Sequence, residues 1–448
     1  MAAPPPHPTR HPAPQQPEWP DPEQIRRVRA ALAARPALVR PGELRALEGA
    51  LARVAAGAAL VVQSGDCAED PDDRTPLDVG RKVAVLDLLA DALRAATGKP
   101  VVRVGRIAGQ YAKPRSQPYE DIGGRRLPSY RGHLVNAPEP DPDRRRPDPL
   151  RVLLGYLAAA EVMRHLGWPA PGATPGHTPG PTPLQSLGIA PAVWTSHEAL
   201  LLDYELPLLR HDEDGRPYLG STHWPWAGMR TCDPDGAHVA LLAAVSNPVA
   251  CKVGPAMTPD TLLALCRRLD PCRRPGRLTL IARMGAGRVT DLLPPLVTAV
   301  RAAGHPVVWL CDPMHGNTVT AHDGTKVRAV ATLCREVVGF QRAVEAAGGI
   351  AGGLHLETTP DDVTECATGD GDAGRAGGTY TSHCDPRLNP WQALAVASAW
   401  RDRPRAVQRP GNGGPPPEPP LRARRTTSWT TSRVTPRATP GTTSRTTP

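Results

Sequence analysis

Aromatic side chains are scarce in this chain. Only 4% of its 448 residues are aromatic, and Phe340 is the single phenylalanine. Apolar residues nevertheless make up 40% of the sequence, which is enough for a large hydrophobic core. That core must therefore be built mainly from alanine, valine and leucine.

Long apolar runs are also missing. No stretch approaches the roughly 18 consecutive apolar residues of a membrane-spanning helix. The opening MAAPPPHPTRHPAPQQ has no apolar region of the kind found in secretion signals. The 9 cysteines form no CxxC pair and no regular spacing, which favours reduced thiols over a disulfide framework. We therefore expect a cytoplasmic protein.

Acidic residues are outnumbered, which gives a formal net charge of +9. Much of the excess comes from an arginine-rich, acid-poor C-terminal stretch, so the charge is weak support for a nucleic-acid partner. Local arginines and lysines serve a phosphorylated, anionic substrate equally well. We expect small anionic substrates, and neither a nucleic-acid nor a membrane partner.

Proline and glycine are abundant and unevenly placed, with 55 and 42 residues respectively. Residues 1–18 are proline-rich, and 404–448 combine proline, threonine and arginine, so both segments are predicted to be disordered. A Pro/Gly/Thr stretch at 169–183 is predicted to be a flexible insertion. One catalytic domain is expected over 19–403.

Short apolar runs recur along that domain and alternate with helical patterns. Asp21 and Pro22 begin one predicted helix, Thr258 and Pro259 begin another, and a third runs from about 81 to Gly98. A fourth covers 289–304, where Pro294 and Pro295 are expected to break the first turn. The alternation predicts an α/β protein with a (β/α)8 barrel, with a doubly wound open sheet as the alternative. The predicted strands are 60–65, 101–106, 192–197, 222–228, 248–254, 277–283, 306–312 and 352–357.

Ionisable or metal-binding side chains follow every predicted strand. In a (β/α)8 barrel the carboxyl ends of all strands converge on one mouth, where active sites lie. Independent loops would seldom carry such residues at every strand end. The residues at these ends are Cys67, Arg106, Glu198, Arg230, Lys252, Arg283, His315 and Glu357, and Asp385 lies on the segment after the last strand.

Four of these residues, Arg106, Arg230, Lys252 and Arg283, are cations. Side by side they would repel one another, so they indicate a polyanionic ligand such as a phosphate or carboxylate. The alternative for any single arginine is an ordinary surface ion pair.

A second set, Cys67, His315, Glu357 and Asp385, combines thiolate, imidazole and carboxylate groups. This mixture suits a divalent transition metal with room left for water or substrate. Alone, His315 is more simply an ordinary loop histidine, and Cys67 a small buried apolar residue.

Long motifs in consistent order then point to a family. GDCAE, VGRIAGQYAKPRS, TSHEALLLDYE, NPVACKVGPAMTPD, GHPVVWLCDPMHGNT and CDPRLN resemble the class II (plant-type) 3-deoxy-D-arabino-heptulosonate-7-phosphate (DAHP) synthases. The resemblance runs from about residue 15 to 400, is poor over 137–191 and is absent after 404. It implies a (β/α)8 enzyme, expected to be a homo-oligomer, that opens the shikimate pathway towards chorismate and the aromatic amino acids.

The resemblance also implies roles for individual residues. Phosphoenolpyruvate would be held by the four cations, and erythrose 4-phosphate would lie towards Lys113, Ser116, Glu198 and Lys326, although Lys326 could equally be a solvated loop lysine. The metal would be held by Cys67, His315, Glu357 and Asp385. It is commonly Mn²⁺ in this family, with Co²⁺, Fe²⁺ or Zn²⁺ as alternatives. Lys252, which is surrounded by arginines, is hypothesised to be a proton donor. Together with the predicted metal ligands His315 and Cys67, it makes up the predicted catalytic residues.

Departures from the family pattern leave alternatives open. Met229 stands where the family usually has a glutamate before the arginine, which puts the positioning of water in doubt. The 137–191 region is partly Pro/Gly/Thr sequence, and the loop before CDPRLN is glycine-rich. One alternative is an amino-DAHP synthase of a specialised-metabolite pathway. Another is a catalytically impaired homologue that acts as a binding or regulatory subunit.

Overall fold

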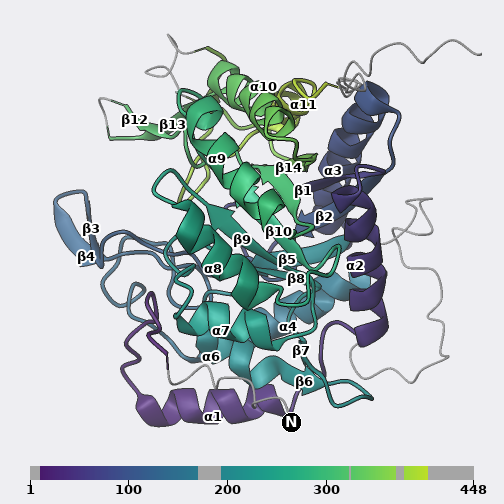
Figure 1. The fold of residues 1–448 in the computed structure, drawn as a ribbon. Helices are drawn as coiled ribbons and strands as arrows, with labels where there is room; N and C mark the ends of the chain where they lie inside the picture. The colour runs from purple at the N-terminus through teal and green to yellow at the C-terminus, as the bar shows by residue number, and fades with distance from the viewer. Residues whose placement is uncertain (1–10, 170–192, 322–323, 370–377, 402–448) are drawn as a thin grey trace, which may run out of the picture. The chain divides into compact units, whose positions relative to one another are not determined.

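Eight parallel strands close into a barrel in the computed structural model, which describes residues 11–169, 193–321, 324–369 and 378–401 (Figure 1). Their order around the barrel is β1-β14-β11-β10-β9-β8-β5-β2. Each coincides with a predicted strand, so the (β/α)8 prediction is confirmed and the open-sheet alternative is wrong. The strands are β1 (Leu60–Gly65), β2 (Val101–Arg106), β5 (Trp194–Glu198), β8 (Trp224–Ala227), β9 (Val249–Val253), β10 (Leu278–Ala282), β11 (Val308–Cys311) and β14 (Ala351–Glu357).

Most of the helices lie between barrel strands in the sequence, and the loops contain smaller sheets. The helices are α1 (Pro22–Ala33), α2 (Pro41–Ala55), α3 (Pro76–Thr97), α4 (Leu150–His165), α6 (Leu202–Glu205), α7 (Ala237–Ala244), α8 (Pro259–Leu269), α9 (Val289–Ala302), α10 (Val330–Ala346) and α11 (Pro390–Ala397), with the 3₁₀ turn η2 (Leu206–Leu208). The minor strands are β3 (Tyr119–Ile122), β4 (Arg125–Pro128), β6 (Leu209–His211), β7 (Pro217–Leu219), β12 (Val319–Thr320), β13 (Lys326–Ala329) and β15 (Cys366–Ala367).

Helix ends follow the local sequence signals. Asp21 accepts hydrogen bonds from the first-turn amides of α1, and Thr258 caps α8 in the same manner. Gly98 ends α3 with a left-handed φ of 67°. The predicted start of α3 near 81 is wrong, because Thr75 and Asp78 form a capping box that begins the helix at Pro76.

The two prolines of α9 do not break its first turn, contrary to the prediction. The helix begins at Val289 and continues through Pro294 and Pro295. The carbonyls that lose a partner belong to Thr290 and Asp291, which are exposed, so water can bind them. Buried apolar residues on the other face of α9 hold it against the barrel.

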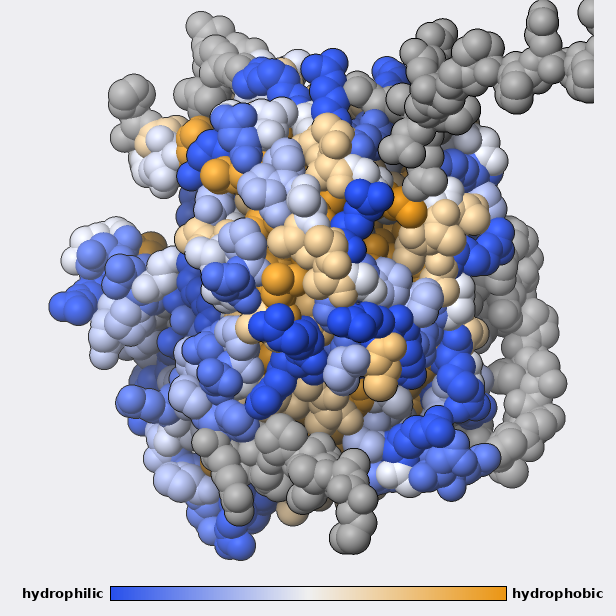
Figure 2. Space-filling view, viewed as in Figure 1, coloured by the Kyte–Doolittle hydropathy of each residue, from blue (hydrophilic) through white to orange (hydrophobic). Residues whose placement is uncertain are grey.

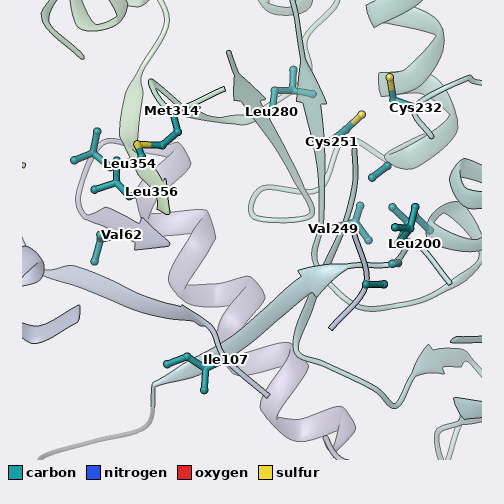
Figure 3. Close-up of a cluster of buried hydrophobic side chains, with 14 of the residues drawn as sticks. Val62, Ile107, Leu200, Cys232, Val249, Cys251, Leu280, Met314, Leu354 and Leu356 are labelled. Atoms are coloured by element: carbon teal, nitrogen blue, oxygen red, sulfur yellow. The ribbon is translucent and has the colours of Figure 1, made fainter. Parts of the chain in front are cut away.

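The barrel strands bury both of their faces. On β1, Val62 packs into the cluster shared with the outer helices, whereas its neighbour Val61 belongs to the cluster inside the barrel. Alternation of this kind is the period-two geometry of a strand. Leu280 and Leu354 belong to the same outer cluster as Val62, and Figure 3 shows part of that cluster.

The inward face changes character along the barrel. Near the amino ends of the strands it carries apolar residues such as Val61, Ala250 and Val308, which pack with Leu47 and Leu51 of α2. Helix α2 therefore closes this end of the barrel. Towards the carboxyl ends the inward positions become polar and charged, which is where the predicted site residues lie.

Residues 11–18, assigned from the sequence to a disordered N-terminus, make specific hydrogen bonds. His11 Nδ1 lies 2.9 Å from the carbonyl of Asp235, and Gln16 Nε2 donates to the carbonyl of Leu200 at 2.9 Å. The remainder of that predicted segment, the predicted tail 404–448 and nearly all of the predicted insertion 169–183 lie outside the described residues.

Polar side chains cover most of the face shown in Figure 2, with apolar residues between them. No helix among the described residues is long and apolar enough to cross a membrane. All nine cysteines are free thiols.

The seam between β1 and β14 gives a test of barrel closure. Gly353 has φ +144°, and a Cβ there would lie 1.8 Å from the Val61 carbonyl oxygen. We expect Gly353→Ala to lower the free energy of unfolding by about 2 kcal/mol or more, as measured by urea denaturation.

Gly49→Ala is the matched control, because Gly49 lies inside α2 and a Cβ added there would meet no atom within 4 Å. This change should stabilise the protein by about 0.5–1 kcal/mol, since it removes a glycine from a helix interior. Equal stability of the two variants would contradict the argument.

Candidate active site

A cavity of about 360 Å³ opens at the carboxyl end of the barrel. All of the predicted site residues line it except Cys67, which is buried just behind it. The structure therefore brings together side chains that lie far apart in the sequence. Those lining the cavity are Arg106, Lys113, Ser116, Glu198, Arg230, Lys252, Arg283, His315, Lys326, Glu357 and Asp385.

Strand register explains why the deepest of these residues meet. Gly65 of β1 pairs with Glu357 on one side and with Arg106 on the other. The two charged side chains thus leave their strands at the same level, with one strand between them. Because Gly65 has no side chain between them, Arg106 Nη2 reaches Glu357 Oε1 at 3.3 Å.

Three of the four predicted metal ligands form a cluster. The donor atoms of Cys67, Glu357 and Asp385 all lie within 4.8 Å of one another. The fourth, His315, places Nε2 3.1 Å from Glu357 Oε1. The donor set is a thiol, two carboxylates and an adjacent imidazole, which fits a divalent transition metal.

The ammonium of Lys113 lies among the same donors. Its Nζ is 2.7 Å from Cys67 Sγ, 2.9 Å from Asp385 Oδ2 and 3.4 Å from Glu357 Oε1. Burial alone would lower the pKa of Lys113, but Asp385, Cys67 and Glu357 outweigh it and hold the pKa well above its usual range. The donor cluster therefore already attracts a positive charge, and Lys113, predicted near the sugar phosphate, lies with the predicted metal ligands.

Glu357 is the most heavily shared carboxylate of the site. Besides Arg106, its partners include Arg328, whose Nη1 is 2.8 Å from Oε2. Burial would raise the pKa of Glu357, but His315, Lys113 and Arg328 hold it well below its usual range. The carboxylate therefore stays ionised and available as a ligand.

A neutral histidine supports Arg106 from below. His355 Nε2 lies 3.0 Å from Arg106 Nη1, and its Nδ1 lies 2.6 Å from Gln63 Oε1. Burial, together with Lys252 and Arg106, lowers the pKa of His355 well below its usual range. The uncharged ring can thus donate to Gln63 and accept from the guanidinium of Arg106.

Asp312 connects the two predicted ligand sets. Its carboxylate accepts from Lys252 Nζ and lies 2.8 Å from His315 Nδ1. Burial lowers the pKa of Lys252 to about 8, aided by Arg106 and Arg283 and opposed by Asp312. The same Nζ lies 5.2 Å from the ring centroid of Trp226. Lys252 can therefore change its protonation state near neutral pH.

The remaining cations occupy different depths. Arg283 is half-buried and donates to the carbonyl of His315 at 2.7 Å. Arg230 is exposed and hydrogen-bonds Ser116 Oγ, and Lys326 is exposed and lies 2.8 Å from Asp385 Oδ1. Arg230 and Lys326 thus lie at the rim of the cavity, above Arg106 and Lys252.

Several buried polar atoms on the cavity wall have no partner within the described part of the chain. They are Glu198 Oε1, Arg106 Nε and Arg283 Nε. Burial raises the pKa of Glu198, although Lys113 and Lys252 oppose this. Because unpaired buried polar groups are costly, these atoms indicate that a polar ligand completes the site.

Glu69 fixes the loop that follows β2. Its carboxylate accepts the backbone amides of Ala108, Gly109 and Gln110 at 3.1, 2.9 and 2.8 Å. The side chain of Gln110 then accepts the amide of Glu198 at 3.0 Å. Glu69 therefore joins the loops that follow β1, β2 and β5.

Reasoning from strand ends missed Arg328 and Gln110. Arg328 lies on β13, the middle strand of a small sheet outside the barrel, and its alternating KVRA segment resembles any short surface strand. Gln110 follows β2 by a few residues and is not ionisable. The one available signal was the number of acidic residues predicted around Glu357, which suggests that a further cation is needed to compensate their charge.

Most of the chain matches a single protein family. The family model of the class-II DAHP synthetase family matches residues 5–173 and 185–400. We expected a poor match over 137–191, but within that region only residues 174–184 lie outside the match.

Curated relatives cover most of the chain. A probable phospho-2-dehydro-3-deoxyheptonate aldolase of Pseudomonas fluorescens is 55% identical over 387 residues, covering 86% of this chain and 94% of the relative. Phospho-2-dehydro-3-deoxyheptonate aldolases of Mycolicibacterium smegmatis and Streptomyces coelicolor are each 40% identical, covering 86% and 88% of this chain and 91% and 96% of the relatives.

Among solved structures, a phospho-2-dehydro-3-deoxyheptonate aldolase from Francisella tularensis aligns over 80% of this chain and 91% of its own, with 11% identity and a TM-score of 0.46. That likeness is too weak to say anything about the site. The sequence matches carry the assignment instead: this chain belongs to the class-II DAHP synthetase family.

Proposed function

We propose that this protein condenses phosphoenolpyruvate with erythrose 4-phosphate and water to give DAHP and phosphate, the first step of the shikimate pathway. The supporting observation is the cavity in which the deep cations Arg106, Lys252 and Arg283 lie beside a thiol–carboxylate cluster with an adjacent imidazole. One set matches an anionic substrate, and the other matches a metal that polarises an aldehyde. Membership of the family supports the same reaction.

Phosphoenolpyruvate is proposed to bind at the deep cations. Arg106 and Arg283 each have a buried, unpartnered Nε at the cavity wall, and Lys252 adds an ammonium. Such a pocket fixes phosphate and carboxylate groups in one orientation, which brings C3 towards the second substrate. Arg230, the fourth predicted phosphoenolpyruvate residue, lies farther out at the rim. Erythrose 4-phosphate is proposed to lie nearer the rim, towards Lys113, Ser116, Glu198 and Lys326.

Cys67, His315, Glu357 and Asp385 are proposed to hold the divalent metal, with Mn²⁺ as the first candidate. When bound, the metal would supply Lewis-acid polarisation of the aldehyde oxygen. The residues themselves provide two carboxylates that are already ionised, because the pKa values of Glu357 and Asp385 are both well below their usual range.

Lys252 is proposed to be the proton donor. Asp312 orients its ammonium and also orients His315, so proton supply and aldehyde activation are aligned by one carboxylate. C3 of phosphoenolpyruvate attacks the aldehyde carbon, whose oxygen receives a proton. Water adds at C2, and phosphate leaves with cleavage of its C–O bond. Met229 stands where the family has a carboxylate, and Glu198 is a buried acidic group on the same cavity wall.

Metal dependence is the first test. Chelator treatment should abolish consumption of phosphoenolpyruvate, followed by its ultraviolet absorbance, and Mn²⁺ should restore it. We expect Cys67→Ser to weaken metal affinity at least about 10-fold, measured by metal content after dialysis, since a soft ligand is lost.

Cys272→Ser is the matched control, because Cys272 is an exposed free thiol away from the donor cluster. It should keep wild-type affinity and activity. Full turnover by metal-free protein would refute the metal-dependent mechanism, and metal binding without any turnover would favour the impaired-homologue alternative.

The pH dependence tests Lys252. A group whose pKa lies at about 8 loses its proton as the pH rises through that value. We therefore expect kcat to fall on the alkaline side of about pH 8. Lys252→Met should lose at least about 10²-fold in kcat.

Asp312→Asn provides the directional control. It removes the charge that opposes the lowering of the Lys252 pKa, so the alkaline limb of kcat should move to lower pH. An alkaline limb that stays in place in this variant, or near wild-type activity of Lys252→Met, would exclude Lys252 as the donor.

A further inference from the structure

The N-terminal segment 11–16 lies across loops that follow three different barrel strands. The Pro12 carbonyl accepts the amide of Ala237, the first residue of α7, at 2.9 Å. Gln16 bridges the loop after β5, because its Nε2 donates to the Leu200 carbonyl and its Oε1 accepts the Leu202 amide, both at 2.9 Å. The segment therefore fastens loops on the carboxyl side of the barrel from outside.

Gln15 reaches the third loop, which carries Lys113 and Ser116, two of the predicted sugar-phosphate residues. Its Oε1 accepts the backbone amide of Arg115 at 2.9 Å, and its carbonyl accepts Arg131 Nη1 at 3.1 Å. Its backbone is left-handed, with φ 67°. Since a non-glycine residue is disfavoured there, these two hydrogen bonds offset a local strain.

Arg115 lies between two residues of the cavity. Lys113, two positions earlier, contacts Cys67 and Asp385, while Ser116 accepts a hydrogen bond from Arg230. The amide of Lys113 also donates to the carbonyl of Arg131 at 2.8 Å. Gln15 and Arg131 thus hold this loop at both of its sides.

We propose that Gln15 is a positioning residue, which sets the place of the Lys113–Ser116 loop and so the affinity for the sugar phosphate. The proposal rests on the function proposed above and deepens it. It concerns the outer substrate, because the loop carries Lys113 and Ser116, whereas Arg106 and Lys252 leave β2 and β9 and make no hydrogen bond to segment 11–16 among the described residues. Gln15 therefore acts through the loop and does not touch substrate.

Steady-state kinetics of Gln15→Ala provide the test. Loss of one half-buried hydrogen bond to the loop should raise KM for erythrose 4-phosphate about 5- to 10-fold, while KM for phosphoenolpyruvate changes less than about 2-fold. Gln15→Glu keeps an acceptor of the same length beside Arg115 and Arg131 and should restore the wild-type KM.

Gln24→Ala is the matched control, since the side chain of Gln24 on α1 makes no hydrogen bond to another described residue. It should behave as the wild-type protein. The positioning role is overturned if Gln15→Ala leaves the erythrose 4-phosphate KM unchanged, or if both KM values and the midpoint of unfolding shift together, as a general folding defect would produce.

Hydrogen exchange separates this proposal from the proposed function. Exchange of the Arg115 amide, followed by mass spectrometry of the peptide that contains it, should be faster in Gln15→Ala than in Gln24→Ala. A wild-type protein without turnover would count against the proposed function, and the exchange result would still decide whether Gln15 holds the loop. Unchanged exchange would overturn that role.

Discussion

The buried carboxylate of Glu357 is the point on which the site depends. Arg106, Arg328, Lys113 and His315 all lie within 3.4 Å of it. A buried carboxylate without partners would be strongly disfavoured. Removing any one of these partners would leave buried charges without full compensation. Because those partners come from β2, β13 and the loops after β2 and β11, one side chain joins segments that the barrel alone would leave independent.

The amino end of the barrel differs from the charged layer because it is packed with apolar side chains. Its inward face is filled by valine, isoleucine and leucine together with two residues of α2, Leu47 and Leu51. Apolar packing needs no individual partner, so it supplies a rigid base with few special requirements. The charged layer above requires pairing atom by atom, and networks through Asp312, His355 and Glu69 provide it.

The sequence predicted the parts of the site that follow directly from strand periodicity. Each barrel strand was recognisable as a short apolar run, so the residue after it could be assigned to the mouth. Features set by distant contacts were not recognisable. Arg328 belongs to a small separate sheet, and Gln15 depends on a partner at a separation of 100 positions.

Local rules also failed where tertiary packing overrode them. Pro294 and Pro295 marked a break by propensity alone, yet the buried face of α9 keeps the helix continuous. The N-terminal prolines suggested disorder, but Gln15 and Gln16 supply hydrogen bonds that hold segment 11–16 against the barrel loops. In both cases the deciding partner was invisible in the local sequence.

The closure of the barrel by α2 has a kinetic consequence. Because the amino end is filled, ligands enter and leave the cavity, within the described part of the molecule, through the mouth that bears Arg230 and Lys326. A ligand at Arg106 and Lys252 lies behind any ligand held at that rim. If the two substrates bind where they are proposed to, the inner one would have to bind first and could not dissociate while the outer one remains.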